Sequence, residues 1–256
     1  EASATLNRAD YAVVAEKNAA FLLDTLRHNG RLLRTYRDGE TKLNGYLEDY
    51  AFLISGLLAT HEATFGDRWL REAIALGKSM IDLFWDDVTG QFYDTGRDHE
   101  ELIVRPRDIS DNAVPAGSSM AADVLLRLSV ITGDSEYQKS AENALRSASE
   151  LMERYPAGAG HWLCALDFYL SETKEIAIVG DRYNADTQAL AVQVYRRFLP
   201  NRILLGRNRE NDLPAGLPLL DGREKIDGRS TAYVCQNYVC QLPVTDPAAL
   251  EDQLAD

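Results

Sequence analysis

Carboxylates gather at two places where the chain enters a long apolar segment. Glu48 and Asp49 follow Tyr46 at the start of the first segment, and Asp108 and Asp111 precede the second. Glycoside hydrolysis needs two carboxyl groups at a set separation, and epimerisation needs an acid and a base flanking one carbon. We therefore take these four acids as candidate catalytic residues acting on a sugar or polyol. Acids at a helix start also suit the helix dipole, so capping stays an alternative for each.

Other side chains in these segments are of the types that bind sugars. The second acidic stretch begins at Asp94, and the arginines near its end either hold carboxylates ionised or simply neutralise them. A histidine beside a tryptophan opens a third apolar segment and could combine an acid/base with a stacking surface, or only cap and pack. The candidate substrate-binding residues are Tyr46, Arg105, Arg107, Asn112, His161 and Trp162.

The cysteines and histidines do not indicate a metal or cofactor. The three cysteines are few and odd in number, which favours a reducing compartment, and we expect a cytoplasmic location. Cys235 and Cys240 have four residues between them, whereas redox pairs normally have two. We expect two buried structural thiols there, with a redox pair as the alternative. The four histidines lie far apart, so we expect no metal site.

Charge narrows the class of partner. The chain has 256 residues, 27 Lys and Arg against 40 Asp and Glu, and a formal net charge of -13. This balance argues against nucleic-acid backbones and anionic membrane surfaces as partners, and it is compatible with neutral sugars. No apolar run approaches the roughly 20 residues that span a bilayer.

The elements that must position the acids alternate in kind. Amphipathic helices are expected at 8–27, 67–84 and from 134, and helices apolar on nearly all sides at 46–65, 113–131 and 161–170. Two extended Gly-to-Thr segments, 30–35 and 90–95, lie 60 positions apart. Repeating helix pairs stack because one pair cannot bury its apolar face alone.

Three outer and three inner helices make half of a closed ring of twelve. We therefore expect a mainly α chain in which residues 1–170 form the incomplete second half of an (α/α)6 toroid. A plain bundle or an open solenoid is the alternative. Because inner helices of a ring are parallel, the two acid pairs would share one mouth.

The composition changes after residue 171. Strands are expected at 175–179 and 202–206 around a helix at 186–198, with a third strand at 231–235 and a helix at 247–254. A strand–helix–strand unit of this kind is expected to be parallel. Residues 171–256 therefore form a small α/β element, and the absence of a glycine-rich fingerprint predicts no nucleotide.

Several long motifs carry a family resemblance. They are Gly45-Tyr-Leu-Glu-Asp-Tyr, Phe92-Tyr-Asp-Thr, Arg105-Pro-Arg-Asp, Asp111-Asn-Ala-Val-Pro-Ala-Gly, Ile176-Ala-Ile-Val-Gly-Asp and Tyr233-Val-Cys-Gln-Asn. The chain resembles the carboxy-terminal part of the spermatogenesis-associated protein 20 family and its bacterial thioredoxin-domain homologues. The resemblance implies an amino-terminal thioredoxin-like domain and a toroid similar to six-hairpin glycosidases and N-acylglucosamine 2-epimerases.

The resemblance implies no established reaction, so two hypotheses follow. The first is a carbohydrate-active enzyme, a hydrolase or an epimerase, working at the toroid mouth. The second is a non-catalytic binding or client-recognition module of a thioredoxin-domain redox protein. The missing toroid half and the thioredoxin-like domain are expected partners, on the same full-length protein or on another chain.

Overall fold

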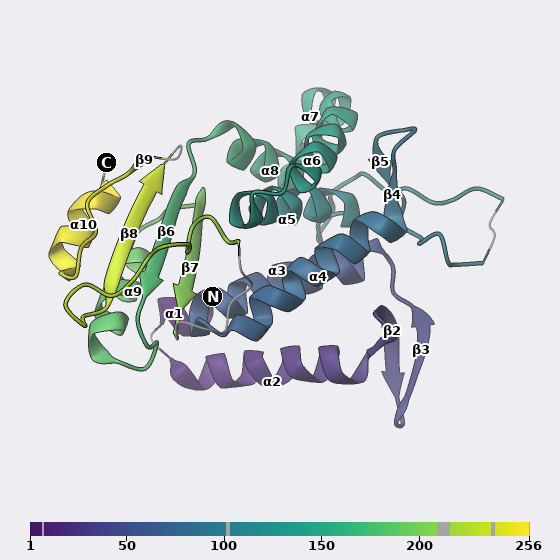
Figure 1. Cartoon of the computed structure of the whole chain (residues 1–256). Helices are drawn as coiled ribbons and strands as arrows, with labels where there is room; N and C mark the ends of the chain where they lie inside the picture. Colours follow the sequence, from purple (N-terminus) through teal and green to yellow (C-terminus); the bar gives the residue numbers. More distant parts are fainter. Residues whose placement is uncertain (7, 101–102, 209–215, 237–238, 256) are drawn as a thin grey trace. The chain divides into compact units, whose positions relative to one another are not determined.

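The computed structural model describes residues 1–6, 8–100, 103–208, 216–236 and 239–255 (Figure 1). Ten α-helices lie in the described residues, and the chain is mainly α as expected. The helices are α1 Ala2–Thr5, α2 Ala9–Thr25, α3 Leu47–Thr64, α4 Asp67–Phe84, α5 Gly117–Thr132, α6 Ser135–Ser147, α7 Ser149–Arg154, α8 Gly160–Leu170, α9 Ala185–Arg196 and α10 Pro247–Ala255, with a 3-10 turn at Pro156–Gly158.

The strands form three small sheets. They are β1 Arg27–His28, β2 Arg31–Arg37, β3 Glu40–Asn44, β4 Trp85–Asp86, β5 Gln91–Phe92, β6 Lys174–Val179, β7 Arg202–Arg207, β8 Thr231–Gln236 and β9 Val239–Cys240. Their order is β1-β2-β3, β4-β5 and β7-β6-β8-β9. Both Gly-to-Thr segments contribute to antiparallel hairpins, the first along most of its length in β2 and the second only at Gln91–Phe92.

The chain divides into two compact units. The helical unit comprises residues 17–57 and 72–170, and the α/β unit comprises 1–16, 58–71 and 171–256. The helices α2, α3 and α4 each contribute residues to both units. The division into domains at residue 170 stays a prediction.

In the helical unit, α5 is the buried helix that its sequence predicts. Eleven of its residues are buried, including Asp123, and it packs against α6 and α8. Gly133 ends α5 in the left-handed conformation that a glycine adopts easily. The carboxylate of Asp134 then caps α6 by accepting from the Glu136 amide. In contrast with α5, α6 buries only one stripe, so the buried and amphipathic helices alternate here as expected.

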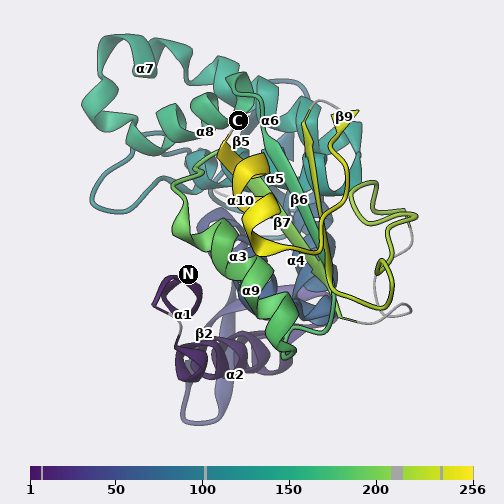
Figure 2. The ribbon, with the colours of Figure 1, turned by 90° about the vertical axis from the view of Figure 1, so that its left-hand side faces the viewer.

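The α/β unit is built on the sheet β7-β6-β8-β9. The β6–β7 pair is parallel, as the strand–helix–strand pattern predicts, and β8 runs antiparallel to β6. Ile176, Ile178 and Val234 point from the sheet into a core that also contains Leu190 of α9 and Leu250 of α10. Figures 1 and 2 show these two helices on the same side of the sheet.

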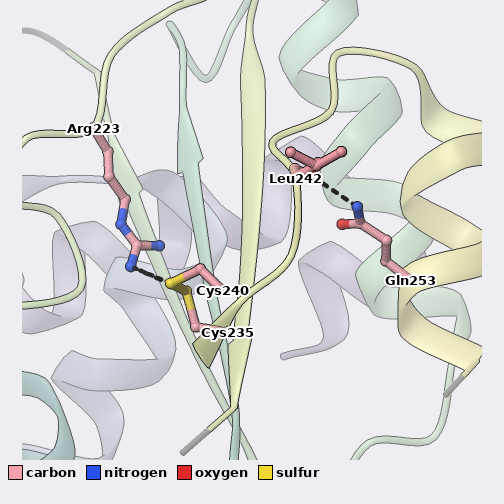
Figure 3. Close-up of a disulfide and its surroundings, with 5 residues drawn as sticks. All are labelled: Arg223, Cys235, Cys240, Leu242 and Gln253. Atoms are coloured by element: carbon pink, nitrogen blue, oxygen red, sulfur yellow. Dashed lines mark hydrogen bonds between the residues drawn. A yellow bond between two sulfur atoms is a disulfide. The ribbon is translucent and has the colours of Figure 1, made fainter. Parts of the chain in front are cut away.

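The cysteines of this unit differ from the expectation of two buried free thiols. Cys235 and Cys240 are joined in a disulfide, and Cys240 is exposed (Figure 3). The two residues are direct cross-strand partners in the β8–β9 hairpin, so their side chains lie on the same face. The sequence spacing alone did not indicate this pairing.

His61 of α3 is held as a neutral imidazole in the α/β unit. It is 1% exposed, its Nδ1 lies 3.1 Å from the Gly66 carbonyl oxygen, and its Nε2 lies 3.4 Å from the Gly206 amide nitrogen. Nδ1–H therefore donates to Gly66 and Nε2 accepts from Gly206. Burial lowers the pKa of His61 to about 4, although the Gly66 carbonyl opposes that shift.

Acidification should therefore destabilise the fold through His61. The pKa is lower in the folded state than in the unfolded chain, so the stabilisation is complete above pH 6.5 and is lost as pH falls towards 4. We expect wild type to lose about 2 kcal/mol between pH 7 and pH 4.5 relative to His61→Gln, by denaturant unfolding. Between pH 7 and pH 8 the difference should stay constant. A difference independent of pH down to 4.5 would contradict the assignment.

Within the described residues, no helix combines the length and the apolar character needed to cross a membrane. In the same part of the chain, no group of three or more His, Cys, Asp or Glu side chains is placed to hold a metal ion.

Candidate functional site

The starts of α3 and α5 lie directly against each other in the helical unit. A Cβ atom at Gly117, in the first turn of α5, would stand 3.0 Å from the amide nitrogen of Glu48 in α3. The loop that contains Asp94 also contacts the start of α3, because the Leu47 amide donates to the Asp94 carbonyl oxygen at 2.9 Å. Residues 69 and 47 positions apart in sequence therefore meet at the starts of α3 and α5.

Asp94 lies at the centre of this meeting point. Its Oδ2 accepts a hydrogen bond from the Asp108 amide at 2.9 Å. Burial raises the pKa of Asp94, and the negative charges of Asp108 and Glu48 raise it further. The Asp108 amide and the Arg107 guanidinium oppose this shift without cancelling it. The carboxylates of Glu48 and Asp108 therefore act on Asp94, and burial together with their charges favours the protonated form of Asp94.

Glu48 and Asp49 share one cation. Arg34 of β2 makes ion pairs with Glu48 at 2.8 Å and with Asp49 at 2.9 Å, and its guanidinium lies 4.7 Å from the Tyr46 ring centre. Asp49 also accepts from the Tyr46 amide at 2.8 Å, which caps its own helix. The Asp49 carboxylate is therefore engaged in a helix cap and an ion pair. The Glu48 side chain is 48% exposed, and its negative charge raises the pKa of Asp94.

The two arginines of the second acidic stretch both stack on Tyr93. The guanidinium carbons of Arg105 and Arg107 lie 4.1 Å and 4.9 Å from its ring centre. Arg105 donates to the Thr95 carbonyl, and Arg107 donates to the Gln91 side chain. Only Arg107 acts on the acid cluster, since its charge lowers the pKa of Asp94.

Asp111 links two helix starts. Its Oδ1 accepts from the Ala116 amide at 2.9 Å and from the Ser119 hydroxyl at 2.6 Å, at the start of α5. Its Oδ2 accepts from the amides of His161 and Trp162 at 2.7 Å and 3.1 Å, at the start of α8. Each carboxylate oxygen accepts two hydrogen bonds, so Asp111 joins the starts of α5 and α8, which is the capping role that the sequence left as an alternative.

The remaining predicted binding residues are Trp162, His161 and Asn112. Trp162 is 1% exposed and donates to the Ile109 carbonyl, which leaves no ring face for a sugar and corrects the predicted stacking role. The His161 Nε2 lies 3.8 Å from an Asp123 carboxylate oxygen. Asn112 is exposed, and its side chain accepts only from the next amide, that of Ala113, among the hydrogen bonds of the described residues.

Sequence reasoning placed Asp94 in the acidic stretch but not among the catalytic candidates. Its position depends on contacts with an amide 14 residues later and with a helix start 47 residues earlier. Arg34 was also missed, although its place in the first Gly-to-Thr segment put it in an expected strand. The residues of this strand do not alternate between buried and exposed, so no local pattern placed Arg34 opposite the acids.

The fold and the site define a class of protein. It is a mainly α chain in which three acids converge beside two adjacent helix starts. The sequence is similar to spermatogenesis-associated protein 20 of Homo sapiens, with 34% identity over 237 residues, 88% of this chain and 30% of the relative. The same protein of Rattus norvegicus shares 33% over 213 residues, 82% of this chain and 27% of the relative. An uncharacterized protein of Caenorhabditis elegans shares 30% over 247 residues, 93% of this chain and 33% of the relative.

These similarities establish homology to spermatogenesis-associated protein 20 over most of the chain. The chain spans about a third of the length of the curated relatives it matches. No family model matches the sequence.

Proposed function

We propose that this chain carries the acid-bearing half of a carbohydrate-active site, in an enzyme that hydrolyses or epimerises a sugar at the mouth of an (α/α)6 toroid. The observation that carries the proposal is the placement of Asp94, half-buried and next to Asp108 and Glu48. Acid/base chemistry on a sugar requires one protonated and one ionised carboxyl group close together. Different environments around the two groups produce this difference in protonation.

In this proposal Asp94 is the general acid, and Glu48 or Asp108 is the ionised partner. The raised pKa of Asp94 favours its protonated form, which is the form that a general acid needs. Tyr46 and Tyr93 offer aromatic rings next to the acids, both of them partly covered by arginine. Asp49 and Asp111 position the helix starts from which these groups project.

The test is Asp94→Asn in the full-length protein, assayed for reducing-sugar release and for epimer formation by NMR on a panel of mono- and oligosaccharides. Loss of an acid/base group should lower kcat by about 10²- to 10⁴-fold. Activity should also fall as pH rises through the raised pKa of Asp94, because the general acid must be protonated.

A matched control is Asp38→Asn. Asp38 is an exposed acid of the same unit with a positive φ of 52°, a conformation that asparagine tolerates. Its activity and melting temperature should equal those of wild type. Full activity in Asp94→Asn, or no sugar turned over by wild type, would count against the catalytic proposal.

The competing proposal is a binding or client-recognition module of a thioredoxin-domain redox protein. The occupied carboxylates of Asp49 and Asp111 favour it, since helix capping explains them without chemistry. In either case we propose that the missing toroid half and a thioredoxin-like domain complete the protein. Val13, Val14 and Phe21 of α2 are exposed apolar residues that such a partner would cover.

A cytoplasmic location is also part of the proposal. Reducing compartments keep most thiols free, and cross-links found there are usually transient. The Cys235–Cys240 disulfide then calls for an explanation other than permanent stabilisation.

A further inference from the structure

The cystine of the β8–β9 hairpin has one accessible and one protected sulfur. Cys235 is 2% exposed, whereas Cys240 is exposed at the outer strand β9 (Figure 3). An incoming thiolate can therefore reach the Cys240 sulfur, and the Cys235 sulfur is then the leaving group.

A guanidinium is aimed at both sulfurs. The Arg223 Nη2 lies 3.1 Å from the Cys235 Sγ and 3.4 Å from the Cys240 Sγ (Figure 3). Its Nη1 is buried and has no hydrogen-bond partner in the described part of the chain. A neutral disulfide is a weak acceptor, whereas a thiolate next to a cation is strongly stabilised. This arrangement favours the state in which the disulfide has been opened.

A proton source lies on the same face of the sheet. Glu175 of β6 is the direct cross-strand partner of Cys235. Burial raises the pKa of Glu175, although the charge of Arg223 opposes the shift. The other groups facing Arg223 are the Tyr233 ring, 5.2 Å from its guanidinium carbon, and the Arg207 side chain, which donates to its carbonyl oxygen. Glu175 is therefore the acid placed to protonate a leaving Cys235 thiolate.

The hairpin does not depend on the cross-link to stay attached. The Gln241 amide donates to the Val234 carbonyl at 2.9 Å, and Ala232 and Val244 exchange two further backbone hydrogen bonds. The Gln253 side chain of α10 also donates to the Leu242 carbonyl at 2.7 Å (Figure 3). The cysteines are only five positions apart, and short loops gain least from a cross-link.

We propose that Cys235–Cys240 is a redox-active disulfide that exchanges with an external dithiol. This inference does not depend on the carbohydrate proposal, which concerns the other unit. A thiolate of the dithiol attacks the Cys240 Sγ, the Sγ–Sγ bond breaks, and Cys235 leaves as a thiolate beside Arg223 and takes a proton from Glu175. The second thiol of the reductant then gives up its proton and attacks the reductant's other sulfur, which is bonded to Cys240, and Cys240 leaves and takes up that proton. The dithiol is oxidised to a disulfide, and the cystine is reduced to two thiols.

The experiment measures opening of the disulfide in the native full chain by dithiothreitol, with alkylation and mass spectrometry of the Cys235 and Cys240 peptides. Arg223→Gln should slow opening about tenfold and shift the exchange equilibrium about tenfold towards the disulfide, or about 30 mV. Lys225→Gln is the matched control, because it removes a positive charge from an exposed residue of the same loop. It should stay within about twofold of wild type.

Equal opening rates in Arg223→Gln and Lys225→Gln would overturn the proposal, as would opening only under denaturing conditions. A second measurement on wild type covers the case in which Arg223→Gln fails to fold. Glutathione should form its mixed disulfide on Cys240, and circular dichroism should be unchanged after reduction. A mixed disulfide mainly on Cys235, or loss of the native spectrum on reduction, would identify a structural cross-link instead.

Discussion

Replacing Gly206 with alanine should lower the free energy of unfolding by about 3 kcal/mol or more. A Cβ atom at this position in β7 would lie 1.9 Å from the Phe65 Cγ and 2.0 Å from its Cδ1, far inside contact distance. Phe65 cannot move away easily, because it is fully buried, its amide donates to the His61 carbonyl, and its own carbonyl accepts from Asn208. Denaturant unfolding of the purified variant measures the loss.

Gly56→Ala is the matched control for this prediction. Gly56 lies within α3, a Cβ there would meet nothing within 4 Å, and alanine is the better helix former. We expect it to be neutral or to stabilise by about 0.5–1 kcal/mol. Adding Phe65→Leu to Gly206→Ala should recover part of the lost free energy of unfolding. The reason is that the smaller side chain removes the ring atoms that the new Cβ atom would overlap. A cost below about 1 kcal/mol for Gly206→Ala would contradict the close packing.

The long helices were predictable because their signals are local. The apolar run after Tyr46 and the Gly66-Asp67 pair that follows it place α3 within one or two residues of its observed ends. The same holds for β6 and β7, where short β-branched or aliphatic runs end at a polar residue or glycine. Strand β3 was missed, since Glu40–Asn44 is mostly polar and is fixed only by pairing with β2.

The site was only partly predictable, because its chemistry comes from contacts distant in sequence. Nothing near Asp94 indicates that the Asp108 amide will bind it or that Glu48 will raise its pKa. Helix capping was the alternative to a catalytic role for Asp111, because a helix start follows it in sequence. Its second pair of bonds goes to a helix 50 residues later, which no local pattern indicates.

The largest loss of stability in the helical unit is expected for Asp111→Ala. The carboxylate accepts four hydrogen bonds, from the Ala116 amide, the Ser119 hydroxyl and the amides of His161 and Trp162. Truncation leaves these donors without an acceptor and removes a negative charge from two helix starts. We expect about 4 kcal/mol of destabilisation, measured by denaturant unfolding.

Asn112→Ala is the control for this loss, because the neighbouring side chain is exposed and accepts only from the Ala113 amide among described contacts. It should cost no more than about 0.5 kcal/mol. Asp111→Asn should fall between the two, since its single carbonyl oxygen can replace one carboxylate oxygen but its NH₂ group faces the donors of the other. A contradictory result would be that Asp111→Ala and Asn112→Ala unfold at the same denaturant concentration while Asp111→Ala loses sugar turnover. Asp111 would then contribute to the reaction and not to stability, and it would join Asp94 as a catalytic residue.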